Sequence, residues 1–456
     1  MASWLKELSR KLGKARVSVD PEILKIHAKD AWFAAHLPEA VVFADSTEVI
    51  SQTLQFAHRK KIPITARGAG RGYVGGCVPQ RGGIVLSLAR MKRIKEIHIE
   101  DGVALVEPGV ITLDLQKAVK KLGLFYPPDP ASLKECTLGG NVATNAGGPR
   151  CLKYGVTRHY ILGLTVVLAD GTVVKVGGRT IKNKSGFDLV SLFVGSEGLL
   201  GIVSEIILRL LPHPTHRGAL SASFATTQQA AKTVQAILQS GILPSALEIA
   251  DRFTLDAARK HLGKSSLIPP GKAHLLIEVD GNAASVKADL KRLTQIVKRF
   301  KALQVVTAQT ERQCEKLWEL RRQFSQSLKA TGLTKLNEDI SIPRGRLTDL
   351  FVFAEKLHHK YNIPVACFGH AGDGNIHVNL MADLTRASIS KKLEQALDEL
   401  FVQILKWDGV ITGEHGIGLA KKRWWPKAST PELRQLHSKI KKALDPRDLL
   451  NPGKFV

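Results

Sequence analysis

The chain begins with apolar residues that recur at the spacing of one helix face. Between residues 3 and 15, large apolar side chains are interspersed with lysines and arginines. The apolar set is Trp4, Leu5, Leu8 and Leu12. This pattern predicts a short, basic, amphipathic helix. Its apolar face has two open roles, which are packing on the body of the protein and lying on a membrane surface.

From about residue 39 the pattern changes to short apolar runs separated by turns. The runs at 40–45 and 62–66 predict strands, and the segment 46–60 between them predicts a helix. Glycine-rich turns continue to about residue 212, and the prolines and glycine of 206–218 indicate a domain boundary. The expected parts are an N-terminal helical segment at 1–38, a first domain at 39–215 and a second domain at 216–456.

The second domain alternates apolar runs with helical patterns. The predicted order is strand 218–225, helix 226–240, strand 274–281, helix 283–301, strand 366–381 and helix 386–408. Over residues 219–330 this rhythm predicts an antiparallel sheet with helices on one face.

A glycine-rich loop follows the predicted strand at 62–66. Its segment Gly70–Gly75 matches a dinucleotide-binding fingerprint, but a Rossmann loop must open a helix. Here the apolar run 84–89 predicts a strand, so the loop joins strand to strand. It can still bind a pyrophosphate, because consecutive glycines expose backbone N–H groups and Arg67 and Arg71 add positive charge. A tight turn without a ligand is the alternative.

Two further segments consist almost entirely of small residues. Residues 127–148 combine glycine, alanine, asparagine and threonine with little bulk, and 195–203 forms another glycine cluster. A packed core is not built from such residues, whereas a backbone that approaches a flat ligand closely is. The sequence therefore predicts a ligand cleft formed by these loops.

The stretch 369–380 places polar side chains along one face of a predicted strand. Asn375, His377 and Asn379 share that face, and the turn before them brings His370 back toward it. Glu414 lies between glycines farther along the chain. Two neutral imidazoles and one carboxylate form a three-ligand site for Zn²⁺, Mn²⁺ or Co²⁺ with a position open for substrate. Histidines that are merely hydrogen-bonded within the fold are the alternative.

Composition limits the class of protein. The 456 residues are 44% hydrophobic and 23% charged, which is ordinary for a globular protein of two or three domains. No apolar run is long enough for a transmembrane helix, and the first residues lack the apolar core that a signal peptide has. The five cysteines form no CxxC pair, which argues against an intrinsic iron–sulfur cluster and for reduced thiols. We expect a cytoplasmic protein, with peripheral attachment to the inner face of the membrane as an alternative.

The formal net charge is +25. Such a charge attracts nucleic acid, an anionic membrane or an acidic protein partner, although a merely solvated surface is an equal alternative. The absence of an RNA-binding motif or zinc finger argues against nucleic acid.

Several ordered motifs carry a resemblance to a known family. They are the loop Arg67–Gly72, "PPDPAS", "TLGGNVATNAGG", "KYGV", "KNKSGFDL" and "GSEGLLGIV". Together they resemble the vanillyl-alcohol-oxidase-type (PCMH-type) FAD domain. With the C-terminal motifs, the chain from about residue 39 resembles the FAD-linked 2-hydroxy-acid dehydrogenases of the glycolate oxidase, D-lactate dehydrogenase and D-2-hydroxyglutarate dehydrogenase type. The implied fold is α+β, with a FAD-binding domain of two α+β subdomains followed by a FAD-linked oxidase C-terminal domain of antiparallel sheet and helices.

The resemblance implies which residues contact noncovalent FAD. The pyrophosphate would be bound by Arg67, Gly68, Ala69, Gly70 and Arg71. The isoalloxazine and ribityl chain would lie against Pro130, Thr137, Gly139, Gly140, Ala143 and Thr144, and the adenosine half near Glu197, Gly198 and Ile202. Two positions depart from the family pattern, because Arg71 stands where the family has threonine or serine and Leu199 stands where it has threonine.

The resemblance also assigns the residues of the reaction. His370, His377 and Glu414 match the metal-binding positions, with zinc as the first expectation. His415 matches the general base, and Arg321 and Asn379 match positions that contact the substrate. Asn337 stands where some relatives have a lysine, which favours D-lactate or glycolate over a dicarboxylate.

The implied activity is oxidation of a D-2-hydroxy acid to the 2-oxo acid, with hydride passing to flavin N5. The electrons would continue to an iron–sulfur subunit, a quinone or cytochrome c. A homodimer and direct oxidation by O₂ stay open. The alternatives are D-2-hydroxyglutarate dehydrogenase and a non-redox flavoenzyme of the alkyl-glycerone-phosphate synthase type.

Overall fold

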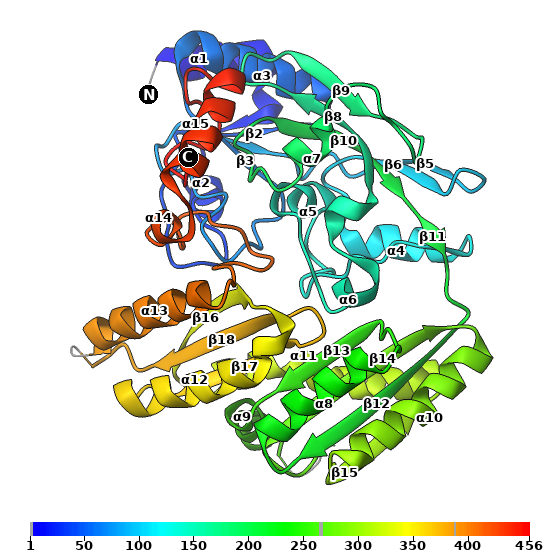
Figure 1. The fold of residues 1–456 in the computed structure, drawn as a ribbon. Helices are drawn as coiled ribbons and strands as arrows, with labels where there is room; N and C mark the ends of the chain where they lie inside the picture. The colour runs from blue at the N-terminus through cyan, green and yellow to red at the C-terminus, as the bar shows by residue number, and fades with distance from the viewer. Residues whose placement is uncertain (1–2, 264–267, 387–388) are drawn as a thin grey trace. The chain divides into compact units, whose positions relative to one another are not determined.

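The chain folds into two compact units. A computed structural model describes residues 3–263, 268–386 and 389–456. The first unit consists of Met1–Gly147, Val156–His213 and Glu414–Val456, and the second of Gly148–Gly155 and Pro214–Gly413. Neither unit is continuous in sequence, a feature that the expected domain boundaries did not include. Figure 1 traces the chain through them.

The first unit contains a mainly parallel sheet with the order β1-β2-β4-β3. Its strands are β1 (Val17–Ser18), β2 (Ala40–Phe43), β3 (Ile64–Arg67) and β4 (Ile84–Ser87). The predicted helix is present as α3 (Thr47–Lys60), and Ser46 caps its N-terminus. Strand β3 leads through the glycine-rich loop directly to β4, and the two strands pair in parallel. The prediction that this loop joins strand to strand is confirmed.

The N-terminal helix packs on this sheet's layer. Helix α1 (Ser3–Leu12) buries Leu8 and Leu12, which belong to one hydrophobic core with Leu54 and Phe56 of α3. Because the apolar face lies inside the protein, its packing role is confirmed and its membrane-surface role is contradicted.

A five-stranded antiparallel sheet completes the first unit, with the order β5-β6-β10-β8-β9. Its strands are β5 (Ile94–His98), β6 (Val103–Val106), β8 (Ile161–Val167), β9 (Val173–Gly177) and β10 (Ile202–Arg209). A small ladder pairs β7 (Leu124–Phe125) with β11 (Leu211–Pro212). The remaining helices are α2 (Pro21–His27), α4 (Thr112–Lys120), α5 (Leu138–Thr144), α7 (Leu189–Phe193), α14 (Trp425–Ala428) and α15 (Pro431–Leu444).

The second unit contains a seven-stranded antiparallel sheet in the order β15-β12-β14-β13-β17-β18-β16. The strands are β12 (His216–Phe224), β13 (Ala246–Ala250), β14 (Ala273–Gly281), β15 (Gln304–Ala308), β16 (Thr334–Ser341), β17 (Val365–His370) and β18 (Asn375–Ala382). The helices are α6 (Cys151–Tyr154), α8 (Thr227–Gln239), α9 (Arg252–Leu262), α10 (Ala283–Arg299), α11 (Glu311–Lys329), α12 (Leu347–Tyr361) and α13 (Ile389–Lys406). Residues 387–388 of the predicted helix 386–408 lie outside the described residues.

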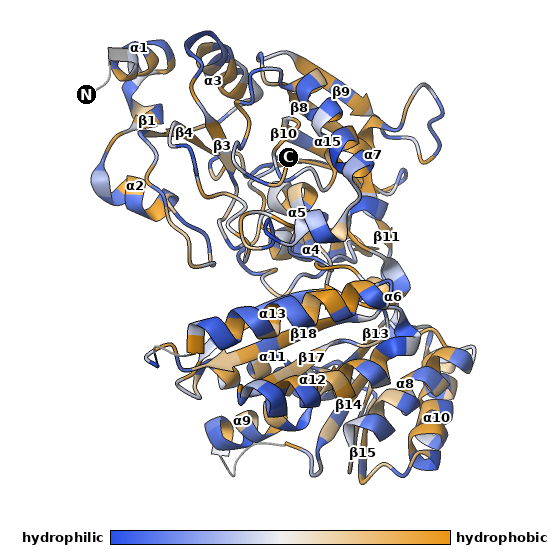
Figure 2. Cartoon of the chain, turned by 60° about the vertical axis from the view of Figure 1, so that its left-hand side comes forward, coloured by the Kyte–Doolittle hydropathy of each residue, from blue (hydrophilic) through white to orange (hydrophobic). Residues whose placement is uncertain are grey.

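Helices cover both faces of this sheet, so the expectation of helices on one face was wrong. Figure 1 shows α8, α10, α12 and α13 on one face and α9 and α11 on the other. The physical reason is that the central strands are buried on both sides, because every residue of β13, β17 and β18 is buried. Figure 2 shows the same division, with hydrophobic strands between helices that bear hydrophilic residues on their outer sides.

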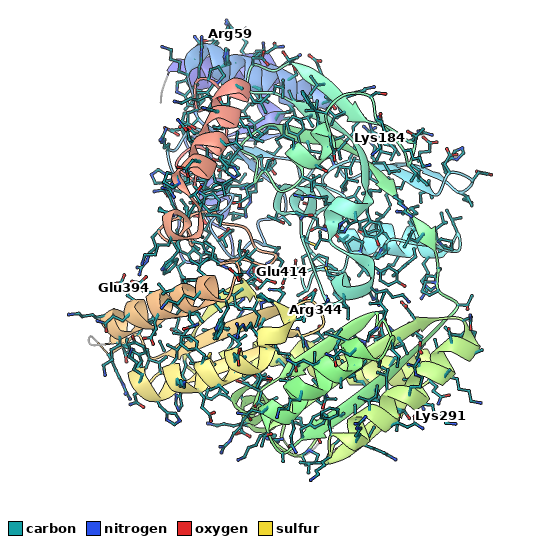
Figure 3. The ribbon with its side chains drawn as sticks, viewed as in Figure 1. Arg59, Lys184, Lys291, Arg344, Glu394 and Glu414 are labelled. Carbon is teal, nitrogen blue, oxygen red and sulfur yellow. The ribbon has the colours of Figure 1, made fainter. Side chains whose placement is uncertain are left out.

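The positive charge is distributed over separate elements. Arg59, Lys184 and Lys291 project from α3, from the loop after β9 and from α10 (Figure 3).

Of the helices in the described residues, none combines the length and the hydropathy needed to cross a bilayer.

We expect Leu8→Ala to lower the free energy of unfolding of the first unit by about 2–5 kcal/mol, because it leaves a cavity at a fully buried position. Chemical denaturation followed by circular dichroism measures the change. Lys6→Ala, at an exposed position of the same helix, is the matched control. Equal stability of the two variants would contradict the packing of α1.

Candidate functional site

The predicted polar strand is one arm of a hairpin. Strands β17 and β18 pair antiparallel, with Phe368 opposite His377 and His370 opposite Asn375. Gly374 in the turn has a φ of +86°, and a Cβ there would lie 2.2 Å from the carbonyl oxygen of Ile342. The tight turn therefore returns the chain so that the two imidazole centroids lie 5.7 Å apart.

A buried carboxylate holds the chain just before Glu414. Asp339 Oδ2 accepts hydrogen bonds from the Gly413 N–H at 3.0 Å and the Thr412 hydroxyl at 3.1 Å. Its Oδ1 accepts one from the Asn375 amide at 2.6 Å. Since Asp339 pairs with His377 across β16 and β18, the loop end is tied to the strand that carries that histidine.

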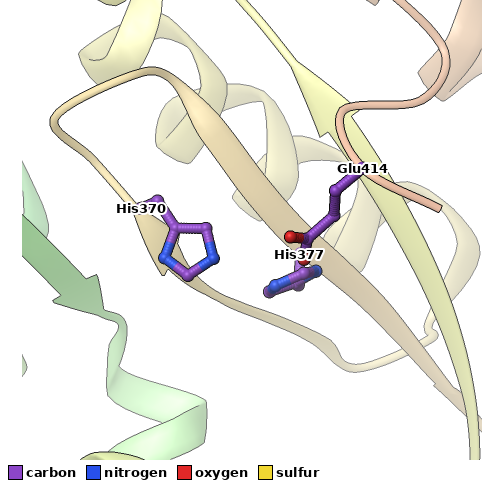
Figure 4. Close-up of side chains that lie close together, drawn as sticks. All are labelled: His370, His377 and Glu414. Carbon is purple, nitrogen blue, oxygen red and sulfur yellow. The ribbon is translucent and has the colours of Figure 1, made fainter. Parts of the chain in front are cut away.

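His370, His377 and Glu414 converge as predicted from their residue types. One ligand atom from each of the three lies within 4.8 Å of the others. Figure 4 shows the two imidazoles and the carboxylate pointing toward one another. The histidines are buried and Glu414 is half-buried. Two imidazole nitrogens and one carboxylate oxygen suit Zn²⁺, Mn²⁺ or Co²⁺, so the residues present fit a divalent metal.

Glu248, in β13, holds two of the predicted site residues. Its Oε1 accepts a hydrogen bond from His370 Nδ1 at 2.6 Å, and its Oε2 accepts one from Arg321 Nε at 2.5 Å. Burial raises the pKa of Glu248, but the charges and hydrogen bonds of His370 and Arg321 outweigh burial and lower the pKa to about 2. An ionised acceptor on Nδ1 leaves Nε2 of His370 as the metal-ligating nitrogen.

Sequence reasoning missed Glu248. It stands alone among apolar residues in "ALEIA", the stretch 246–250, and only 1% of it is exposed. A single acid within a buried strand is the signal that could have identified it, because such an acid needs a partner.

Arg321 lies on α11 beside the same sheet face. Its Cζ is 4.9 Å from the centroid of the Phe368 ring. Lys335 Nζ lies 6.0 Å from that centroid and donates a hydrogen bond to Ser325 Oγ at 2.8 Å. Burial, together with the charges of Lys329 and Arg321, lowers the pKa of Lys335 to about 8. The two cations create a positive region that favours an anionic ligand, and Lys335 was not predicted.

Asn379 is fully buried in β18. Its amide nitrogen donates hydrogen bonds to the carbonyl oxygens of Ala366 and His377, each at 3.0 Å. Its Oδ1 has no hydrogen-bond partner among the described residues. The Oδ1 atom of Asn379 is therefore available as an acceptor, and a ligand hydroxyl could donate a hydrogen bond to it.

His415 follows Glu414 directly. Its Nε2 lies 3.8 Å from Glu414 Oε1, and its ring centroid lies 5.4 Å from that of Tyr73. The imidazole is thus placed beside the carboxylate with an aromatic neighbour on its face.

The predicted FAD-binding loops of the first unit lie against one another. A Cβ at Gly68 would lie 2.5 Å from Thr137 Oγ1, and one at Gly139 would lie 2.6 Å from Pro108 Cβ. Thr137 caps α5 by accepting a hydrogen bond from the Gly140 N–H at 3.3 Å. Ala69 and Thr137 line a cavity of about 240 Å³. The close backbone approaches explain the glycines, and the residues present fit a flat cofactor that needs the same small surface.

The two arginines of the pyrophosphate loop have partners within the protein. Arg67 is buried and donates hydrogen bonds to the Lys29 carbonyl oxygen at 2.6 Å and to Cys77 Sγ at 3.2 Å. Arg71 is exposed and pairs with Glu135 at 2.7 Å. Their charge is therefore partly engaged in holding the loop, and backbone N–H groups are the main anion donors that the loop offers.

Other predicted cofactor residues lie around α5 and β10. Thr144 donates a hydrogen bond to the Gly140 carbonyl oxygen, and the Glu197 N–H donates to the Ala143 carbonyl oxygen at 2.8 Å. Gly198 has a φ of +71°, and Ile202 begins β10 as a buried residue. Pro130 accepts a hydrogen bond from the Leu133 N–H at 2.8 Å.

Comparisons with known proteins match two families to two successive parts of the chain. The family described as FAD binding domain matches residues 38–177, and the family described as FAD linked oxidases, C-terminal domain, matches residues 213–455. "Glycolate oxidase subunit GlcD" of Bacillus subtilis is 41% identical over 92% of this chain and 89% of its own length. "D-lactate dehydrogenase" of Anaerostipes hadrus is 33% identical over 98% of this chain and 96% of its own.

Solved structures share the fold at low sequence identity. p-Cresol methylhydroxylase superposes with a TM-score of 0.79 at 20% identity, covering 99% of this chain and 96% of that one. An alkyldihydroxyacetonephosphate synthase superposes with a TM-score of 0.74 at 18% identity, covering 98% and 85%. With the matched families, these likenesses confirm the expected α+β fold with a PCMH-type FAD-binding domain and a FAD-linked oxidase C-terminal domain.

We expect Glu248→Gln to weaken divalent metal binding about 10–100-fold, because it removes the acceptor that orients His370. Calorimetric titration with Zn²⁺ or Mn²⁺ measures the affinity. Glu278→Gln is the matched control, because Glu278 is equally buried in the neighbouring strand but bonds to Trp318 and Arg217. An unchanged affinity in Glu248→Gln would contradict the orienting role.

Proposed function

Because the chain belongs to the FAD-linked oxidase family, we propose that it is an FAD-dependent dehydrogenase of D-2-hydroxy acids. D-lactate and glycolate are the first substrates to consider, given the names of the relatives. The observation that carries the proposal is the convergence of His370, His377 and Glu414, with Arg321 beside Phe368 on the sheet face that bears the two histidines.

Arg321 would bind the substrate carboxylate. Its Nε hydrogen is engaged by Glu248, so the two terminal nitrogens of the guanidinium are the donors for a carboxylate. Glu248 and the Phe368 ring together fix the direction of the guanidinium. The unsatisfied Oδ1 of Asn379 would accept a hydrogen bond from the substrate.

His415 would accept the proton of the substrate hydroxyl. General-base catalysis of this kind contributes roughly 10²–10⁴-fold to rate. His370, His377 and Glu414 would hold a divalent ion, with zinc as the first expectation and Mn²⁺ or Co²⁺ as alternatives. Such an ion, when bound, supplies Lewis-acid polarisation of a hydroxyl oxygen.

The loops of the first unit would hold FAD without a covalent bond. The residues proposed to contact it are Arg67, Gly68, Ala69, Gly70, Arg71, Pro130, Thr137, Gly139, Gly140, Ala143, Thr144, Gly198 and Ile202. Bound flavin supplies the hydride acceptor for the oxidation, and the protein supplies position and charge.

The electrons would then pass to a separate acceptor. The five cysteines form no disulfide and no CxxC pair for an intrinsic cluster, so an iron–sulfur subunit, a quinone or cytochrome c would receive the electrons. The net charge of +25 supports contact with an acidic partner or with the anionic inner face of the membrane. The proposed enzyme would be cytoplasmic and would form a homodimer.

D-2-Hydroxyglutarate oxidation is a second candidate, and one observation favours it. Asn337 lacks the charge that a distal carboxylate needs, but Lys335 lies two residues away on the same strand. Its ammonium shares the Phe368 ring with Arg321. A dicarboxylate could therefore find a second cation here.

Anaerobic titration with a panel of D- and L-2-hydroxy acids tests the proposed activity. We expect the purified protein to be yellow and its flavin absorbance to be bleached by D-2-hydroxy acids. The order of affinities among D-lactate, glycolate and D-2-hydroxyglutarate decides between the candidates. A yellow protein that no hydroxy acid bleaches would contradict the dehydrogenase and favour a non-redox flavoenzyme.

We expect the KM for D-2-hydroxyglutarate to rise as the pH passes about 8, because the lowered pKa of Lys335 means that its charge is lost there. Lys335→Met should raise this KM about tenfold at pH 7 and remove the rise, since one charge-assisted hydrogen bond is lost. Initial rates with D-lactate, which has no distal carboxylate, are the control. A KM for the dicarboxylate that is independent of both pH and Lys335 would exclude the second candidate.

A further inference from the structure

The loop that carries Glu414 and His415 is held at its two ends by two different carboxylates. Before Glu414, the Thr412 hydroxyl and the Gly413 N–H donate to Asp339 Oδ2. After His415, the Ile417 N–H donates to Glu197 Oε1 at 2.8 Å and the Gly418 N–H donates to Glu197 Oε2 at 2.9 Å. The pair between these anchors consists of one predicted ligand and the predicted base.

The Glu197 anchor depends on a close approach of the backbone. Gly416 has a φ of +87°, and a Cβ there would lie 2.7 Å from Glu197 Oε1. Gly418 has a φ of +48°, and a Cβ there would lie 2.3 Å from the Val74 carbonyl oxygen. Only glycine permits both the conformation and the contact, so this turn is shaped to bring its N–H groups onto the carboxylate.

Glu197 is itself fixed by its main chain. Its N–H donates to the Ala143 carbonyl oxygen at 2.8 Å, and its carbonyl oxygen accepts a hydrogen bond from the Asn451 side chain at 2.8 Å. Its own φ is +51°, a conformation that a residue with a side chain adopts at a cost. The side chain is therefore directed toward the loop by a backbone that tolerates little movement.

The Asp339 anchor is equally fixed. Asp339 is fully buried in β16 and lies opposite His377 of β18 in the register. Its other oxygen is bonded to the Asn375 amide, at the start of the same strand. Any shift of Asp339 would therefore move the loop relative to the strand of a proposed ligand.

We infer that Glu197 and Asp339 are positioning residues that set Glu414 and His415 for metal binding and proton transfer, an inference that rests on the proposed function. Each carboxylate accepts hydrogen bonds from groups of the protein itself, so each can act without touching the substrate. For Glu197 this role replaces direct contact with the adenosine half of FAD, which the resemblance had implied. The loop ends differ in their anchors, so each can be tested separately.

The test uses the full-length protein loaded with FAD and titrated calorimetrically with Mn²⁺ and with Zn²⁺. We expect Glu197→Gln and Asp339→Asn each to weaken metal binding about 10–100-fold, as expected when the groups that orient a ligand are lost. Each substitution keeps the size of the side chain but replaces one acceptor oxygen with a donor. The FAD affinity of Glu197→Gln, measured by flavin fluorescence, should stay unchanged.

Asp445→Asn is the matched control. Asp445 is a buried carboxylate that accepts hydrogen bonds from the Leu449 and Leu450 N–H groups at another turn, and it also pairs with Lys441. The metal affinity of this control variant should equal that of the unmodified protein.

In the two test variants kcat should fall while KM for the hydroxy acid changes little, because Arg321 keeps its hydrogen bond to Glu248. A general loss of folding would instead lower both the melting temperature and the flavin content.

The outcomes separate the inference from the proposed function. Unchanged metal affinity in both test variants, with binding intact in the unmodified protein, would overturn the inference and leave the proposed function standing. Loss of FAD affinity with retained metal affinity in Glu197→Gln would overturn it in favour of a cofactor contact. No metal binding by the unmodified, flavin-loaded protein would overturn the proposed metal site and the inference together.

Discussion

The candidate site depends on one buried carboxylate that serves two side chains. Glu248 receives His370 on one oxygen and Arg321 on the other. Burying an ionised acid is costly, and it is tolerated here because both oxygens are satisfied by strong donors. With a pKa of about 2, the carboxylate stays ionised throughout the physiological range, so its hold on both partners does not vary with pH there.

Glu248, His370 and Arg321 make one region of this face of the seven-stranded sheet polar. The helices α9 and α11 pack on the same face with apolar residues such as Phe324, which meets Phe368 with ring centroids 6.1 Å apart. Phe368 in turn supports the guanidinium of Arg321 and lies 5.4 Å from the His377 ring. Apolar packing thus holds the charged groups of the site in fixed positions. Their attraction to one another is stronger there than it would be in water, because the site is buried.

The sequence predicted much of this fold and the donors of the site, for identifiable reasons. Period-2 and period-3.6 patterns were strong in α1, α3 and β18, and the helical and strand predictions there are confirmed. The histidines and Glu414 could be grouped because their residue types and flanking glycines were unusual. Whether they bind metal stays a prediction.

Sequence patterns could not identify residues whose role depends on partners that are far away in the sequence. Glu248 lies far from both of its partners in sequence, and only the order β13-β17-β18 brings it beside His370. Asp339 and Glu197 look like ordinary acids until their backbone partners are known. Helices on both faces of the second sheet were missed because α9 and α11, which cover the second face, went unpredicted.

The discontinuity of the first unit has a consequence for biosynthesis. Its parallel sheet is joined by the C-terminal tail, where the Ile64 N–H donates to the Leu449 carbonyl oxygen and the Asn451 N–H donates to the Ile64 carbonyl oxygen. Those partners leave the ribosome about four hundred residues after β3. All of the second unit has been synthesised once Gly413 is made, so it can fold before the tail, whereas the first unit stays incomplete until the tail has left the ribosome.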